Sequence, residues 1–119
     1  MTTQHLKAQA RYQPGLAIID LYGELTALAN AALNTAYAQA ESQKPAMVLL
    51  NFGGVSHINS SGIGLIVSLV ARTRQSQRSL MAYGLSSRNE ELFKIIGLTE
   101  FIAILPDEVS ALATVAMAA

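Results

Sequence analysis

The chain has 119 residues, the size of one domain around a single hydrophobic core, so we expect no multidomain enzyme. Its 8 Lys and Arg residues balance 8 Asp and Glu residues, and the formal net charge of +0 provides no long-range attraction for nucleic acid or an acidic membrane. Hydrophobic residues make up 51% of the chain and charged residues 13%, which predicts a well-buried core rather than disorder.

Cysteine is absent, so we expect neither a disulfide framework nor a thiolate metal site. The first five residues lack the basic and apolar layout of a signal peptide, which favours a cytoplasmic protein. The longest strongly apolar stretch, Ile63 to Ala71, is interrupted by Ser68 and is far shorter than the ~18–20 residues that cross a bilayer. No membrane span is therefore predicted.

The first half of the chain alternates strand-like and helix-like patterns. Residues 7–13 and 16–22 read as two strands, and Pro14-Gly15 between them predicts a tight hairpin. Residues 28–43 are rich in Ala with apolar positions at helical spacing, which predicts a helix. Residues 47–52 form a nearly continuous apolar run, typical of a central strand covered on both faces of a parallel sheet.

The following segment contains the polar residues that carry the functional hypothesis. We expect residues 53–58 to form a connection and a helix to begin at Ser60 or Ser61 and to end near Gln77. Residues 80–84 then read as a further strand.

The last third of the chain repeats this alternation. Ser87 and Glu90 have the spacing of a capping box, which predicts a helix that ends at Gly97. Its expected apolar face consists of Leu92, Ile95 and Ile96. A short strand at 101–104 and a helix that runs to about Met117 complete the chain.

The predicted order is ββαβαβαβα in one α/β domain, with its core at about residues 7–117 of the 119. Strands separated by helices of this length imply right-handed crossovers and a mostly parallel sheet. We expect the first strand to lie antiparallel at one edge of the sheet, with helices packed around it.

In an open α/β sheet, ligands and partners meet the surface where strands end and helices begin, because unpaired backbone N–H groups point outward there. Three junctions qualify: 23–26, 56–62 and 84–87. The second is the most informative, since it places hydroxyl groups and an amide at a helix start and follows them with Gly62 and Gly64. A phosphoserine would be stabilised at this position by the helix dipole.

Simpler readings of the same residues stay open. Ser60 and Ser61 also suit helix capping, a purely structural role. A serine hydrolase is poorly supported, because Asn59 stands where the first Gly of Gly-x-Ser-x-Gly would be needed and neither His5 nor His57 has a triad pattern. No spaced metal-ligand cluster, dinucleotide fingerprint or P-loop occurs, so no cofactor is expected.

The helix after Ser61 is apolar on more than one side. The stripe expected to face the sheet contains Ile63, Ile66, Val67 and Val70. Leu65 and Leu69 would then lie on the opposite side. Either a neighbouring helix or a second copy of the chain covers them, as in a homodimer, or they form a partner-binding ridge.

Residues 48–64 resemble the phosphorylation-site segment of the STAS domain family, the anti-sigma factor antagonists of bacteria. The family's site reads Asp-Ser-Ser-Gly with the second Ser modified, so the resemblance implies Ser61 as the phosphoacceptor. Residues 23–25 are similar to the family's Gly-Glu-Leu, and residues 93–101 to its third helix and last strand. The resemblance covers about Lys7 to Ala113.

Three positions where family members often carry Asp hold neutral residues here, namely Thr26, Asn51 and Asn59. By the resemblance, Thr26 and Asn51 would line the floor of the site and Asn59 would shape its loop. Neutral side chains can hydrogen-bond a phosphate without Coulomb repulsion. If a carboxylate orients the hydroxyl or contacts the kinase, its loss would instead make Ser61 a poor substrate. Both effects remain open at this point.

The resemblance implies a non-enzymatic binding module of transcription regulation, an anti-sigma factor antagonist that works by partner switching. It would dock onto an anti-sigma factor serine kinase, which uses ATP and Mg²⁺, and would be switched off when Ser61 is phosphorylated and restored by a phosphatase. The docking face would contain Asn59, Ser60, Ser61, Gly62, Leu65 and Leu69. The alternative is an unphosphorylated scaffold module of a stressosome-type or lipid-transport complex.

Overall fold

The computed structural model describes residues 5–118 and confirms the predicted order ββαβαβαβα. Two short 3₁₀ helices, η1 and η2, are added to that order. The elements are β1 (Lys7–Gln13), β2 (Leu16–Leu25), η1 (Ala27–Ala29), α1 (Asn30–Ser42), β3 (Met47–Ile58), α2 (Ser60–Gln75), β4 (Ser79–Tyr83), α3 (Ser87–Ile95), η2 (Leu98–Glu100), β5 (Ile102–Leu105) and α4 (Glu108–Ala118).

The five strands form one sheet in the order β1-β2-β3-β4-β5. β1 pairs with β2 in antiparallel fashion, and the other neighbouring pairs are parallel. The predicted mostly parallel sheet with an antiparallel edge strand is therefore confirmed. Because β2 to β5 run in the same direction, their carboxyl ends point to the same end of the molecule, where the helices of the crossovers begin.

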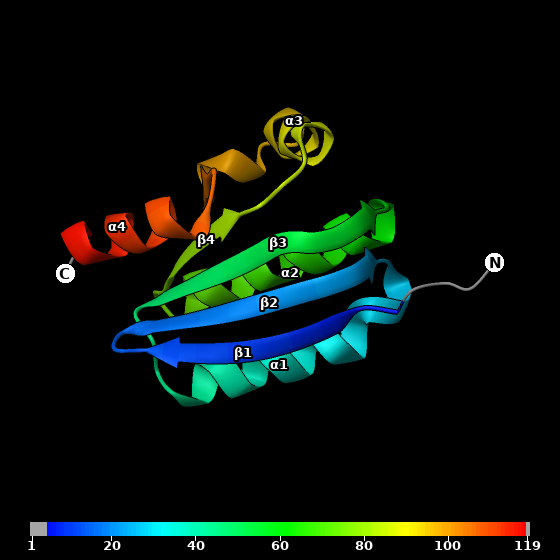
Figure 1. The fold of residues 1–119 in the computed structure, drawn as a ribbon. Helices are drawn as coiled ribbons and strands as arrows, with labels where there is room; N and C mark the ends of the chain where they lie inside the picture. The colour runs from blue at the N-terminus through cyan, green and yellow to red at the C-terminus, as the bar shows by residue number, and fades with distance from the viewer. Residues whose placement is uncertain (1–4, 119) are drawn as a thin grey trace.

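Two apolar clusters lie on the two faces of the sheet. The larger joins the sheet to α1, α2 and α3, and in it the rings of Phe52 and Phe93 meet edge to face at 5.8 Å between centroids. The smaller lies under α4, whose Ala111 is buried against Ile18 and Leu49. Figure 1 shows α1 and α2 on one side of the sheet and α4 on the other.

The two central strands are longer than the sequence predicted. Residues 23–25 and 53–58, expected as loops, continue β2 and β3, and the pairing reaches Leu25 and Ile58. The glycines and polar residues of these segments are typical of connections. In the structure, however, Gly54 lies within the paired strands β2 and β3, opposite Tyr22. A Cβ at Gly54 would lie 2.4 Å from Cδ1 of Tyr22, so the Tyr22 ring packs directly on the Gly54 backbone.

The start and the buried face of α3 also differ from the prediction. The capping side chain is that of Ser86, whose Oγ accepts a hydrogen bond from the Asn89 N–H at 3.1 Å, so the expected cap at Ser87 is wrong by one residue. Phe93 is the fully buried residue of the helix, whereas Ile95 is 74% exposed and Ile96 45%. The Phe93 contact with Phe52 turns Ile95 and Ile96 out of the core.

The predicted faces of α2 are corrected as well. The buried arc contains Gly62, Ile66, Leu69, Val70 and Thr73. Leu69 is 1% exposed and Val67 is 49% exposed, so an exposed ridge that includes Leu69 is wrong and Val67 does not face the sheet. Leu65 is half-buried against the larger core cluster. Packing in the larger core cluster accounts for Leu69, which neither a covering element nor a partner-binding ridge had anticipated.

A close contact between the backbones of α2 and β2 determines which side of α2 is buried. The Asn59 N–H donates to the Leu25 carbonyl at 3.2 Å, and a Cβ on Gly62 would lie 2.0 Å from that same oxygen. Gly64, one half-turn later, is exposed, and a Cβ there would meet nothing within 4 Å. The two glycines therefore have different reasons to be present, and only Gly62 is required by the packing of α2 on β2.

Opposite effects are expected when each glycine is replaced by alanine. Gly62→Ala should lower the free energy of unfolding by more than about 2 kcal/mol, because α2 must move away from Leu25. Gly64→Ala should raise it by up to about 1 kcal/mol through helix propensity alone. Urea denaturation of both variants measures this, and a Gly62→Ala protein as stable as the wild type would contradict the contact.

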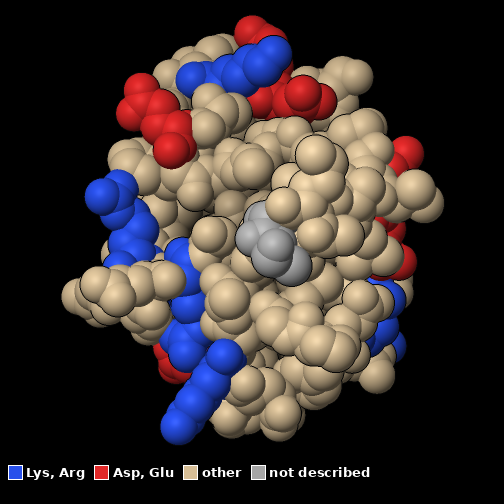
Figure 2. Space-filling view, turned by 90° about the vertical axis from the view of Figure 1, so that its left-hand side faces the viewer, with Lys and Arg blue, Asp and Glu red and all other residues tan. Residues whose placement is uncertain are grey.

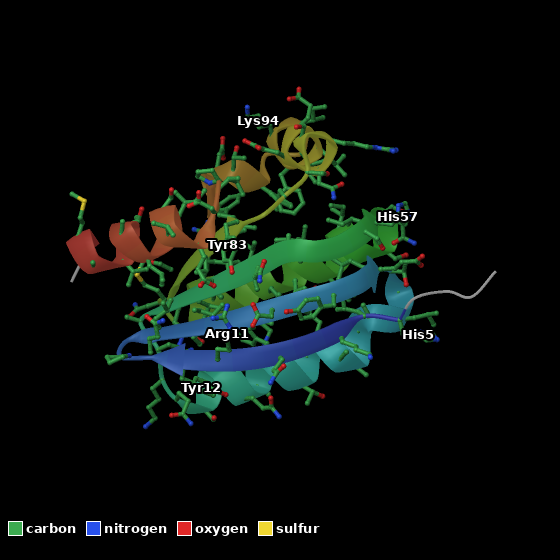
Figure 3. All side chains as sticks on the ribbon, viewed as in Figure 1. His5, Arg11, Tyr12, His57, Tyr83 and Lys94 are labelled. Atoms are coloured by element: carbon green, nitrogen blue, oxygen red, sulfur yellow. The ribbon has the colours of Figure 1, made fainter. Side chains whose placement is uncertain are left out.

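A polar network ties β1, β2 and β3 to α4 on the face of the sheet opposite α1 and α2. Arg11 donates through Nη2 to Oδ1 of Asp20 at 2.9 Å and to Oε1 of Glu108 at 2.6 Å, and Tyr83 donates to the same Glu108 oxygen at 2.6 Å (Figure 3). Asn51 donates to Oδ1 of Asp20 at 2.7 Å. Burial alone would raise the pKa of Asp20, but the hydrogen bonds from Arg11 and Asn51 outweigh burial and lower it.

Asn51→Asp should destabilise the fold in a pH-dependent way. A second carboxylate would replace the amide donor beside Asp20, at a cost of about 2 kcal/mol near pH 7.5. Two close carboxylates raise the pKa of one of them, so a proton taken up on acidification should shrink the deficit relative to the wild type toward pH 5.

Wild-type stability should change little between these two pH values, because the lowered pKa of Asp20 keeps its stabilising contribution in place above the unfolded pKa, near 3.8, and the contribution is lost only on further acidification. Urea denaturation at both pH values measures the difference. Asn51→Ala, which removes the hydrogen bond without adding charge, is the control and should show a deficit of similar size at both. An equal deficit for Asn51→Asp at both pH values would contradict the account.

Candidate functional site

The candidate site lies where β3 gives way to α2, at the end of the molecule on the right in Figure 1. Asn59 is the N-cap of α2, and its Oδ1 accepts a hydrogen bond from the Gly62 N–H at 2.9 Å. The Asn59 carbonyl accepts from Ile63 N–H at 2.9 Å. Ser60 and Ser61 are therefore the first two helical residues, and capping is performed by Asn59 rather than by either serine.

Both serines are exposed, and neither hydroxyl makes a hydrogen bond within residues 5–118. The backbone N–H groups of Ser60 and Ser61 also find no acceptor in that part of the chain, as is usual for the first turn of a helix. A hydroxyl at Ser61 is thus accessible to another protein. A phosphate attached to it would lie beside unpaired N–H donors and the positive end of the α2 dipole.

Thr26 lies close to this helix start, as the sequence suggested. It directly follows Leu25, whose carbonyl holds the Asn59 N–H, and its own Oγ1 accepts a hydrogen bond from the Leu28 N–H at 3.2 Å. Thr26 is therefore the N-cap of η1. A capped turn at this point brings η1 and the first turn of α2 together at the ends of two neighbouring strands.

Asn51 does not line the site, so this expectation is wrong. It lies seven residues before Ile58 in the same strand, which at about 3.3 Å per residue places it roughly 20 Å from the end of β3. Its side chain is engaged by Asp20 and by the Gly53 N–H, which donates to Oδ1 at 2.9 Å. The resemblance implied this place for Asn51, but β3 continues to Ile58 and separates Asn51 from the start of α2.

The two chain segments that present Ser61 carry no charged side chain. Neither residues 25–40 nor residues 58–71 contain a Lys, Arg, Asp or Glu. The first cation of α2 is Arg72, about 16 Å along the helix axis from Ser61, and its guanidinium lies over the Tyr37 ring at 4.4 Å. A dianion on Ser61 would therefore receive no neutralising cation from α2 near its own turn.

Neutral surface is not confined to this end. Figure 2 shows the opposite end of the molecule, where much of the surface is also uncharged and Lys and Arg side chains gather on the left and lower left. What distinguishes the candidate site is the combination of a neutral surround with exposed hydroxyls at a helix start.

Catalytic and metal-binding alternatives gain no support from the described residues. His57, at the end of β3 (Figure 3), makes no hydrogen bond with Ser61, and no carboxylate bonds to either serine hydroxyl in residues 5–118. No group of three or more His, Asp or Glu side chains suited to a metal ion occurs among those residues. Nor does any of their helices have the length and apolar character needed to cross a bilayer.

A pocket next to the site was missed by the sequence reasoning. It lies between the end of β3 and α3, has a volume of about 420 Å³ and includes His57, Ile58 and Ile95 in its lining. The prediction placed Ile95 in the core, which hid the signal. The signal that could have revealed the pocket is Ile95 itself. Phe93 already anchors α3 in the core, which leaves a second large apolar side chain of this helix at the surface.

Comparisons with known proteins agree with this architecture. The model of the STAS domain family matches residues 7–111. The anti-sigma-B factor antagonist of Listeria monocytogenes is 31% identical over 88 residues, which covers 72% of this chain and 77% of that protein.

Two solved structures share the fold at lower identity. An anti-sigma factor antagonist from Mycobacterium paratuberculosis superimposes with a TM-score of 0.73 at 16% identity, over 92% of each chain. The Bacillus cell fate determinant SpoIIAA in its phosphorylated form gives a TM-score of 0.70 at 22% identity, over 91% of this chain and 98% of that one. With a family match over most of the domain and the sheet, crossovers and helix order to support it, the chain belongs to the STAS domain family.

Proposed function

We propose that this chain is an anti-sigma factor antagonist, a binding protein rather than an enzyme, and that phosphorylation of Ser61 switches it off. The observation that carries the proposal is the exposed Ser61 hydroxyl in the first turn of α2, beside unpaired N–H groups. The 31% identity to an anti-sigma-B factor antagonist supports the partner class.

The partner is an anti-sigma factor with serine kinase activity, which brings ATP and Mg²⁺, since no nucleotide motif occurs in this chain. Docking of the unmodified protein occupies the anti-sigma factor and releases its sigma factor. A phosphatase removes the phosphate and restores binding.

The switch works through desolvation of charge. The two segments that present Ser61, residues 25–40 and 58–71, contain no Lys, Arg, Asp or Glu, so a docked partner buries them at little electrostatic cost. Phosphate adds about −1.5 to −2 charges at the centre of that face. Removing this charge from water is unfavourable, so the complex dissociates.

Individual residues have distinct parts in this scheme. Ser61 accepts the phosphate, Asn59 caps the helix that presents it, and Ser60 supplies a neighbouring N–H. Gly62 allows α2 to lie against Leu25, and Thr26 forms the adjacent capped turn. Leu65, half-buried, lies at the margin of the docking face, while the buried Leu69 supports it from within.

Phosphorylation should depend on Ser61 alone. Each anti-sigma factor kinase of the source genome is incubated with the wild type and with Ser61→Ala and Ser60→Ala, with Mg²⁺ and ATP, and the intact mass is measured. We expect one phosphate on the wild type and on Ser60→Ala and none on Ser61→Ala, because only Ser61 is the acceptor. Both substitutions leave the Asn59 cap in place, so each serves as the structural control for the other.

Loss of the phosphate only in Ser60→Ala would move the acceptor by one residue. No phosphate on the wild type with any kinase would contradict the switch and favour an unphosphorylated scaffold.

A further inference from the structure

The pocket beside the candidate site is created by unequal strand lengths. β4 ends at Tyr83, opposite Asn51, whereas β3 continues for seven more residues. In place of a strand, α3 lies next to this extension of β3, as Figure 1 shows. A helix does not fill the space beside a strand edge completely, and a cavity of about 420 Å³ remains between them.

Three apolar side chains line the pocket among six polar or charged ones. Ile58 is 7% exposed at the base, Leu92 is half-buried, and Ile95 is 74% exposed at the side. One cation, Arg88, and one anion, Glu91, also line it, so the lining charges balance. Because the lining charges balance, the pocket favours no ion, and the exposed Ile95 side chain offers an apolar contact surface.

The pocket lies within reach of any partner that engages Ser61. Three Cα–Cα steps separate Ile58 from Ser61, so these Cα atoms are at most about 11 Å apart. A stable protein–protein interface buries about 800 Å² on each partner, equivalent to a disc of roughly 16 Å radius. An interface of this size centred on the Ser61 hydroxyl therefore extends beyond Ile58, one of the residues that line the pocket.

We propose that the pocket between β3 and α3 receives an apolar side chain of the anti-sigma factor that docks at Ser61. This inference rests on the proposed function and adds to it a second, apolar contact next to the phosphorylated turn. Ile95 contributes the largest exposed apolar surface in the pocket and is expected to be the main contact residue.

Ile95→Gln tests the contact against a closely matched control. Val109 on α4 is also β-branched and is 79% exposed, compared with 74% for Ile95, but it lies on the other face of the sheet. Glutamine adds no charge and so leaves the helix dipole interactions unchanged. Affinity is measured by calorimetry for the wild type, Ile95→Gln and Val109→Gln, using the kinase that phosphorylates Ser61 with Mg²⁺ and ADP, so that no phosphate is transferred.

We expect Ile95→Gln to raise the dissociation constant about tenfold or more and Val109→Gln to leave it within about twofold. Thermal unfolding of both variants should match the wild type, since both side chains are exposed. If Ile95→Gln binds as tightly as the wild type while Ser61 is phosphorylated, the pocket contact is overturned and the switch stands.

Two other results would also overturn it. If Ile95→Gln abolishes self-association in light scattering and leaves the kinase affinity unchanged, the occupant is a second copy of this chain. If no kinase binds the wild type, both the contact and the proposed function fail.

Discussion

The close approach of α2 to β2 determines how the candidate site is presented. Gly62 faces the Leu25 carbonyl at a distance that leaves no room for a side chain, and this contact sets the rotation of α2 about its axis. Once Gly62 points inward, Ile66 and Leu69 follow it into the core and Gly64 points outward. Ser61 is consequently held in the first exposed turn, where its hydroxyl is accessible.

Much of the fold was predictable because its periodicities are strong. The Pro14-Gly15 hairpin, the apolar central strand and the helices appear where local patterns place them. The lengths of β2 and β3 were not predictable, since residues 53–58 pair only because Leu25 and the Tyr22 ring lie alongside them. Two arcs of α2 were almost equally apolar, so the choice of Leu69 as a core residue depended on a tertiary contact that local patterns do not contain.

The three neutral residues at positions where STAS proteins often have Asp have different local reasons. Asn51 donates to Asp20, a contact that a carboxylate could not make without repulsion. Asn59 and Thr26 accept hydrogen bonds from the N–H groups of Gly62 and Leu28, which an Asp would also accept. Only Asn51 is therefore explained by its surroundings. At Thr26 and Asn59 the neutral side chains instead add no charge to the segments that present Ser61.

The central claim is that charge on Ser61, rather than a change of fold, ends partner binding. The most direct measurement compares the affinity of the anti-sigma factor for the unmodified protein and for the protein carrying phosphoserine at position 61, with circular dichroism recorded for both. The account predicts a dissociation constant at least about tenfold higher for the phosphorylated form and superimposable spectra. Equal affinities, or weaker binding accompanied by loss of helical signal, would contradict it.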